Sequence, residues 1–419
     1  MSSEQLNFYI DTPGMTGKPL PVKSYHISYD LFEASGTWEV EVDPNVTITD
    51  NFTRAAVRIE LNDYPLMKGF IDRVEMECDK ANWSQHYSGR DMCSVLIDNY
   101  ILAYKPYLSG SVQSILADVW SKSNTITQVN WRGNADHAGE PIEQLSTPLS
   151  LPNLNFVYTS EAVNALSKGV VLTQGVRASP GQTLHEFFKD LLNQYGCYYY
   201  NQPGTNNIVI ATIPLNGRSY NPDGTLDASP IADLDWDRVE SFSRTRDYSG
   251  YYPFIRLLGQ NDAQDIQENA DSKDIQGNKI FRIPYKTEYL NLKTVNEYLA
   301  ISDTSDPQVI IANNFQKFYV NEINVGSAAI WNNESQKLLS NKRMDQVRSL
   351  DNVKFTLHSH LIDGKPFFVN RVMTIIDMAS TEKPNRLRLY GLYLLVHVEL
   401  HGDRNEGKKT ELEFCPVLN

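Results

Sequence analysis

The N-terminal part of the chain, up to about residue 80, alternates apolar and polar side chains with the period of two that is typical of a β-strand. In residues 38–42, for example, Trp38, Val40 and Val42 share one face, and two glutamates share the other. The same pattern occurs in residues 25–31, 56–61 and 67–77. Several short strands at this spacing predict a small antiparallel sandwich or barrel.

Two later segments instead have the 3.6-residue period of an amphipathic helix. One covers residues 111–120, and the other covers residues 184–195. The second has the signals of both helix ends, because Thr183 and Glu186 form the pattern of a capping box and Gly196 stands at the C-cap. A hairpin of residues 197–200 and 208–213 follows directly. A helix next to a hairpin predicts a compact α+β unit.

We therefore expect a β-rich α+β fold, with two small β-barrel-like or sandwich-like domains and additional α+β parts. The expected domains are an N-terminal β-barrel-like domain at 1–104, an α+β domain at 105–215, a second β domain with a polar loop at 216–306, and a C-terminal α+β/β segment at 307–419. Residues 312–319 suggest a further helix, and 260–277 a surface loop. The C-terminal strands are predicted at 353–357, 367–377, 390–401 and 410–414, with a turn at 363–366.

Charge and hydropathy exclude several classes of protein. The 419 residues include 38 Lys and Arg against 51 Asp and Glu, which gives a formal net charge of −13. An acidic chain without a cluster of basic residues is not expected to grip nucleic acid, since phosphate contacts need concentrated positive charge. No apolar run approaches the ~18 residues of a transmembrane helix, and no signal peptide is recognisable, so we expect no membrane anchor.

The sequence predicts neither an enzyme nor a cofactor. It contains no Gly-x-Ser-x-Gly elbow, His-Glu-x-x-His helix, Walker loop or Gly-x-Gly-x-x-Gly turn. His358 and His360 would share one face of a strand, but no third ligand stands at a telling distance, so we expect no metal there. Asp233, Asp235 and Asp237 alternate as in a calcium loop without its turn glycine, which favours a solvated acidic loop.

Several segments, in a consistent order, resemble the Mu-like family of phage baseplate hub proteins. Residues 69–74 (Gly-Phe-Ile-Asp-Arg-Val) are similar to a hairpin of that family, and residues 87–98 (Tyr-Ser-Gly-Arg-Asp-Met-Cys-Ser-Val-Leu-Ile-Asp) to the Gly-Arg segment that follows it. Residues 180–188 resemble its Gly-Glu-Thr-x-x-Glu-x-Leu element, and residues 257–260 its central strand. Residues 363–367 and 393–400 resemble its last hairpins.

The resemblance implies a structural protein of the virion, assembled in the host cytoplasm. Hubs of this family are homotrimers in which each chain supplies two similar β domains, so that three chains continue the sixfold tail tube of a contractile injection system. The opposite face receives the central spike, here expected to be a separate protein, and other baseplate proteins surround the hub. DNA would only pass through the channel, where we expect negative charge to keep it from sticking.

The same resemblance points to motif residues with structural or interface roles: Gly69, Phe70, Asp72, Gly89, Arg90, Asp91, Gly181, Gln182, Glu186 and Gly364. Arg90 and Asp91 pair either within the chain or across a subunit boundary, and the first arrangement is the commoner one. Three alternative functions stay open: a baseplate-associated cell-wall hydrolase, a carbohydrate-binding tail module, and a hexameric distal tail or tube protein.

Overall fold

The structure of the protein is a computed structural model. This structure describes residues 4–11, 17–43, 55–78, 83–101, 107–123, 125–129, 143–166, 170–193, 195–212, 220–226, 232–234, 238–245, 254–259, 285–289, 320–325, 352–362, 364–375, 392–403 and 407–417. The expected helix at 312–319, the expected loop at 260–277 and the acidic positions Asp235 and Asp237 lie outside these ranges.

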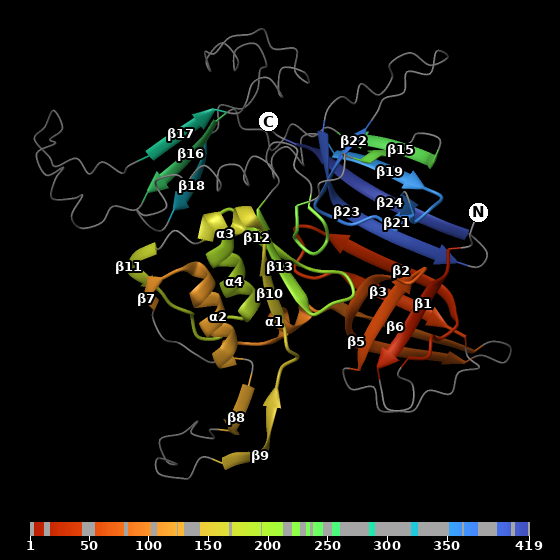
Figure 1. Ribbon diagram of the computed structural model, residues 1–419, viewed down its shortest axis with the longest axis horizontal. Coiled ribbons are helices and arrows are strands. Elements are labelled where there is room, and N and C mark those ends of the chain that lie inside the picture. The colour runs from red at the N-terminus through yellow and green to blue at the C-terminus, as the bar shows by residue number, and fades with distance from the viewer. Residues whose placement is uncertain are drawn as a thin grey trace, which may run out of the picture.

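Twelve strands form one continuous sheet (Figure 1). Their order along the main path is β1 (Leu6–Asp11), β4 (Ala56–Leu61), β5 (Tyr64–Cys78), β6 (Trp83–Asp91), β3 (Thr37–Val42), β2 (Val22–Asp30), β23 (Leu392–Asp403), β24 (Gly407–Pro416), β19 (Asn352–Leu357) and β15 (Val239–Thr245). Strand β22 (Arg371–Ile375) also pairs with β23 and carries β14 (Ala232–Leu234).

The antiparallel pair of β2 and β23, which we call the seam, joins six N-terminal strands to six from the C-terminal half. The two β blocks, expected as two small barrel-like or sandwich-like domains, therefore share one sheet. They also share one hydrophobic core, which extends from Phe8 and Trp38 to Phe355 and Phe414. Within the described ranges the strand ladders close neither block into a barrel, although a single bridge from Phe8 to Leu20 brings β1 beside the approach to β2.

The predicted N-terminal strands are confirmed, and the alternation of apolar and polar residues matches the alternation of buried and more exposed side chains. In β3, Trp38, Val40 and Val42 are buried while the side chains between them face outward. The hairpin of β4 and β5 turns at Asn62 and Asp63, whose φ angles of 47° and 67° lie in the left-handed region that Asn and Asp tolerate best. The C-terminal strands β19, β22, β23 and β24 also form where alternation predicts them.

The α+β unit lies beside the sheet (Figure 1). It contains helices α1 (Ser94–Asp98), α2 (Val112–Ser123), α3 (Ser160–Leu166) and α4 (Leu184–Asn193), with strands β10 (Asn155–Tyr158), β13 (Asn207–Thr212) and β12 (Cys197–Asn201) in that order. Helices α2 and α4 are confirmed, and Gly196 ends α4 with a φ of 66°. Helices α1 and α3 have five and seven residues, too few for a helical period to stand out.

The apolar core of this unit begins at Met92, before the expected domain boundary at 105, and includes Leu96 and Ile101. A smaller apolar cluster lies where Tyr198 and Tyr200 of β12 pack against the C-terminal block. The α+β unit therefore contacts both β blocks. None of the helices within the described ranges is long and apolar enough to span a lipid bilayer.

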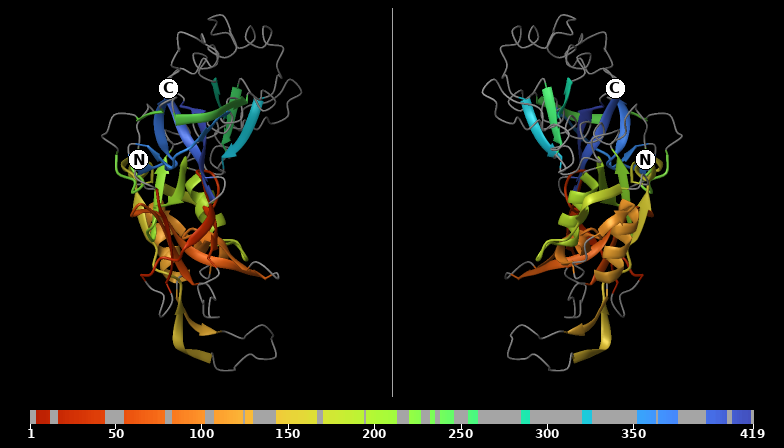
Figure 2. Two further views of the ribbon diagram at one scale, coloured as in Figure 1. Left: turned by 90° about the vertical axis from the view of Figure 1, so that its right-hand side faces the viewer. Right: turned by 90° about the vertical axis from the view of Figure 1, so that its left-hand side faces the viewer.

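Smaller sheets complete the structure. Strand β7 (Tyr107–Gly110) pairs with β11 (Val170–Val176), and β16 (Phe254–Gly259) lies between β17 (Tyr285–Tyr289) and β18 (Val320–Val325). Strands β8 (Thr125–Val129) and β9 (Glu143–Ser150) form a ribbon that extends away from the rest of the protein (Figure 2). The hairpin of β20 (Leu361–Ile362) and β21 (Lys365–Pro366) includes Gly364, with a φ of 76°.

Candidate functional site: the junction of the sheet and the α+β unit

Strands β5 and β6 approach each other so closely that only glycine fits at two positions. A Cβ atom on Gly89 would lie 1.9 Å from the carbonyl oxygen of Phe70, and one on Gly69 would lie 2.0 Å from the carbonyl oxygen of Arg90. The register shifts between Ile71 and Arg73, which leaves Asp72 unpaired in a β-bulge. The bulge therefore presents Asp72 at a point where the regular ladder is interrupted.

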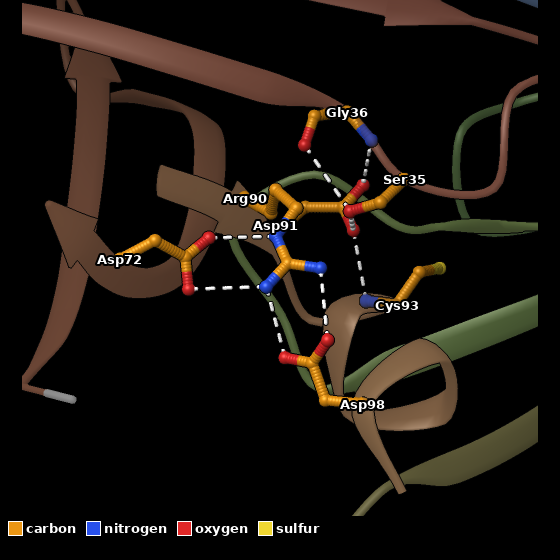
Figure 3. Close-up of polar contacts among 7 residues, drawn as sticks. All are labelled: Ser35, Gly36, Asp72, Arg90, Asp91, Cys93 and Asp98. Carbon is orange, nitrogen blue, oxygen red and sulfur yellow. Dashed lines mark hydrogen bonds and ion pairs between the residues drawn. The ribbon is translucent and has the colours of Figure 1, made fainter. Parts of the chain in front are cut away.

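Arg90 binds two carboxylates of the same chain (Figure 3). Its Nε and Nη2 donate to Asp72 at 2.6 and 3.2 Å, and its Nη1 and Nη2 donate to Asp98 at 3.0 and 2.9 Å. Asp72 belongs to β5 and Asp98 ends α1, so the guanidinium joins the sheet to the α+β unit. This is the intrachain arrangement, with bidentate geometry toward both partners.

Asp91 is buried, with 4% of its surface exposed. Its carboxylate accepts hydrogen bonds from the Ser35 hydroxyl at 2.6 Å, the Gly36 amide at 2.8 Å and the Cys93 amide at 2.8 Å (Figure 3). Burial raises the pKa of Asp91, and these hydrogen bonds oppose the rise. The side chain thus ties the end of β6 to the start of α1 and to the residues before β3.

The motif residues before α4 lie beside the chain that leaves α1. The Ile101 amide donates to the Gln182 carbonyl at 3.1 Å, and the Leu184 amide donates to the Asn99 carbonyl at 2.9 Å. The expected capping box is present, since Glu186 accepts from the Thr183 amide at 2.9 Å and Thr183 Oγ1 accepts from the Glu186 amide at 3.1 Å. The segment that contains Arg90 and the segment that starts α4 are therefore packed together.

The remaining motif residues have different positions. Gly181, with a φ of 79°, forms the turn before α4, where Gln182 Oε1 accepts from the Ser179 amide at 3.0 Å. Phe70 packs against the core of the α+β unit. Gly364 lies apart, in the β20–β21 hairpin. Nine of the ten motif residues thus gather at two neighbouring places in the junction, and the tenth does not.

A contact on the other side of the α+β unit reaches the C-terminal block. The Tyr198 hydroxyl donates to Asn370 Oδ1 at 2.7 Å, next to the apolar cluster formed by Tyr198 and Tyr200. Together with the Arg90 contacts, it fixes the α+β unit against both halves of the sheet. These contacts can hold the α+β unit and the two β blocks in a fixed relative orientation.

The expectation for His358 and His360 on one strand face is wrong, because β19 ends at Leu357. His358 is exposed and lies 3.7 Å from Glu240, whereas His360 is fully buried. The buried ring shares hydrogen bonds with the Tyr25 hydroxyl at 2.7 Å and Thr410 Oγ1 at 2.6 Å. The two imidazoles therefore lie in different environments, one exposed and one buried.

A polar cluster at the seam was missed in the sequence. His397, Glu399 and His401 alternate along β23, and His26 and Asp30 of β2 are register partners of His401 and His397. The His-x-Glu-x-His pattern was a usable signal, because a strand places all three side chains on one face. Its partners on β2 are more than 360 residues away, and no local pattern could identify them.

The protein is similar in structure to solved proteins, but its sequence matches no family model and no curated protein. Among solved structures, a tail protein from Neisseria meningitidis MC58 has a TM-score of 0.62 at 12% identity, covering 99% of this chain and 96% of that one. The 43 kDa tail protein of prophage MuSo2 from Shewanella oneidensis has a TM-score of 0.61 at 13% identity, with 99% of both chains covered.

A third similar structure is larger than this chain. It is a chain of the Francisella PdpA–VgrG complex, with a TM-score of 0.50 at 9% identity; 99% of this chain covers 52% of that one. The fold predicted by the resemblance is thereby confirmed. The chain shares its β-rich α+β fold with these two tail proteins along nearly its whole length.

Proposed function

We propose that this protein is the central hub of a phage-type baseplate, joining a sixfold tail tube to a threefold central spike. The observation that carries the proposal is the near-complete match, in both directions, to two tail proteins, one of them from a prophage. Such coverage supports a role for the whole chain, because nearly all of this chain matches each tail protein and nearly all of each tail protein matches this chain. At this level of identity the match supports a structural role in a tail.

The organisation of the sheet supports the hub position. Strands β2 and β23 divide the twelve strands into two sets of six, contributed by the two halves of the chain. Three chains would bring six such blocks around one axis, which suits a connector between sixfold and threefold parts. The pairing at the seam and the shared core would hold the two blocks of each chain in a constant relation.

The partners follow from this position. One face of the trimer would bind the tail tube protein, the other the central spike, and the rim other baseplate proteins, within a virion tail assembled in the host cytoplasm. The channel would let DNA pass. With a formal net charge of −13 per chain, the protein has no general attraction for phosphates. We expect it to leave linear duplex DNA unshifted in an electrophoretic mobility assay at physiological salt.

The test is a binding assay with the tail tube and spike proteins encoded near this one. A hub binds both at once, and the ternary complex sediments as one species. A distal tail protein would bind the tube and not the spike. Clearing of peptidoglycan in a gel assay would favour the hydrolase, and retention on immobilised polysaccharide would favour the carbohydrate-binding module. Either result without binding of the spike would contradict the hub.

A further inference from the structure

Six of the eight histidines of the chain lie at or beside the seam. They are His26, His86, His358, His360, His397 and His401. They come from separate parts of the sequence and are brought together by the pairing of β2 with β23 and by the strands on either side. Imidazole is the commonest metal ligand among side chains, so a cluster of histidines is a candidate metal site.

Two of these histidines and one carboxylate place possible ligand atoms close together. The atoms come from His26, Glu399 and His401, and they all lie within 4.8 Å of one another. His26 Nε2 is 3.7 Å from Glu399 Oε1, and His401 Nε2 is 3.3 Å from Glu399 Oε2. Two ligands of a tetrahedral zinc ion stand about 3.4 Å apart, given bonds of about 2.0–2.1 Å. Both distances to the carboxylate are close to that value.

We propose that His26, Glu399 and His401 bind a divalent transition-metal ion of the zinc class, which links the two β blocks across the seam. His26 belongs to the N-terminal block, and the other two ligands belong to the C-terminal block. Two imidazoles and one carboxylate suit zinc and its neighbours in the first transition row. Magnesium and calcium prefer sites made of oxygen ligands.

His397 has the position of a residue that orients a ligand. Its Nε2 lies 3.3 Å from Glu399 Oε1, and its Nδ1 lies 3.2 Å from Asp30 Oδ2. With a carboxylate beside each ring nitrogen, this imidazole is placed to hold Glu399 in position, and it is not one of the three grouped ligands. Outer groups of this kind fix the ligands of metal sites and tune their affinity.

The rings of His26 and His401 are stacked, with centroids 4.4 Å apart and planes 10° from parallel. The lone pairs of parallel rings do not meet at one point, so binding requires one imidazole to turn about its Cβ–Cγ bond. Both side chains are partly exposed, 38% for His26 and 37% for His401, and both line the groove toward which a ring would turn. The ion would replace the stacked pair with two bonds to one centre.

The two histidines open onto a groove of about 640 Å³ that gives an ion access. Carboxylates outnumber basic side chains on its walls, with Glu39, Glu41, Glu75, Glu240, Asp403 and Glu411 against Arg73, Lys408 and Lys409. This balance attracts cations and disfavours anions. The remaining positions around the metal would then be filled by water from the groove.

The experiment uses the purified full chain, stripped with a chelator and titrated with zinc chloride at mildly alkaline pH, so that protons do not compete for the imidazoles. We expect about one zinc ion per chain with an affinity on the order of micromolar or tighter, and a rise of about 3–8 °C in the midpoint of thermal unfolding. Calcium and magnesium chloride should leave the midpoint unchanged. Absence of zinc binding would overturn the proposal.

Variants locate the ion. His26→Gln and His401→Gln should each weaken zinc binding ~100-fold or more, and His397→Gln should weaken it about 10–100-fold as a positioning residue. His358→Gln, in the same groove, is the matched control and should bind as the wild type does. Undiminished binding in the double variant H26Q/H401Q, or equal loss in H358Q, would place the ion elsewhere and contradict the assignment.

A spectroscopic readout on the unmodified protein covers the case of a variant that does not fold. Cobalt(II) replaces zinc in such sites and develops intense visible absorption when nitrogen ligands hold it in a tetrahedral field. We expect this absorption to appear on titration of the wild type and to disappear on addition of one equivalent of zinc. The weak spectrum of the hydrated ion at all ratios would refute the site. This inference does not depend on the proposed role as a hub.

Discussion

Gly89 lies so close to Phe70 on the neighbouring strand that a Cβ atom would stand 1.9 Å from the Phe70 carbonyl oxygen and 2.8 Å from the Trp38 ring. Gly89→Ala must therefore push β5 and β6 apart next to a buried tryptophan. We expect it to lower the free energy of unfolding by about 2–3 kcal/mol, as overpacking of a tight site does. Urea denaturation measures the change.

Ser88→Ala is the control for that substitution, because it changes the adjacent residue of the same strand without adding an atom. It should alter the free energy of unfolding by no more than about 0.5 kcal/mol. A Gly89→Ala protein as stable as the control would show that the strands have room to separate and that the close approach is not a constraint.

Arg90 should resist replacement by lysine. Lys keeps the charge but offers a single ammonium, which cannot form paired hydrogen bonds to Asp72 and Asp98 at once. We expect Arg90→Lys to cost about 1 kcal/mol of stability. A double-mutant cycle with Asp98→Asn should give a coupling energy of about 1 kcal/mol between the two positions. Strictly additive effects would mean that the pair does not hold α1 to the sheet.

Asp91→Asn tests the buried carboxylate. The carboxylate accepts hydrogen bonds from three donors through two oxygens, while an amide has one oxygen and would turn an NH₂ group toward the remaining donors. We expect a loss of about 2–3 kcal/mol. Asp190→Asn on the exposed side of α4, where the carboxylate accepts a long 3.3 Å bond from Gln182, should cost much less. Similar costs for both would argue against a special role for Asp91.

His360 makes the protein sensitive to acid. Burial lowers its pKa to about 4, although Glu4 nearby favours the charged form. The unfolded chain, with an ordinary pKa of about 6.5, therefore takes up the proton first as the pH falls, and the folded state loses stability between about pH 6.5 and pH 4. The shift corresponds to a loss of about 3 kcal/mol over that window.

The measurement is the free energy of unfolding against pH for the wild type and for His360→Asn, which cannot be protonated. We expect the variant to be less stable at neutral pH and to lack this part of the decline at acidic pH. His358→Gln, two residues away and exposed, should keep the decline of the wild type. Parallel curves for wild type and His360→Asn would contradict the assignment of the acid sensitivity to this residue.

Local patterns predicted the elements of this fold better than their arrangement. The alternation of Trp38, Val40 and Val42 in the sequence matches the burial of their side chains. The capping box joins Thr183 to Glu186, which are only three residues apart in the sequence. The seam between His26 and His401 joins strands at opposite ends of the chain. Pairing at that distance depends on the whole fold, so local patterns predict two small β domains and not the sheet that joins them.

The candidate site shows the same division. The Gly-Arg-Asp segment is a distinctive pattern in the sequence, and hydrogen bonds hold the side chains of Arg90 and Asp91 at the junction. Their partners were not foreseeable, because Asp72 reaches Arg90 through a β-bulge and Asp98 through a helix of five residues. The alternation of His397, Glu399 and His401 is a signal for the histidines of the seam, but the same alternation is typical of an ordinary strand.

The mass of the purified protein in solution, measured by light scattering alone and with the spike protein added, tests the central claim most directly. The hub predicts three times the 47.6 kDa of the chain, either for the protein alone or on addition of the spike. A hexamer would indicate a distal tail or tube protein. A monomer that the spike leaves unchanged would contradict the hub.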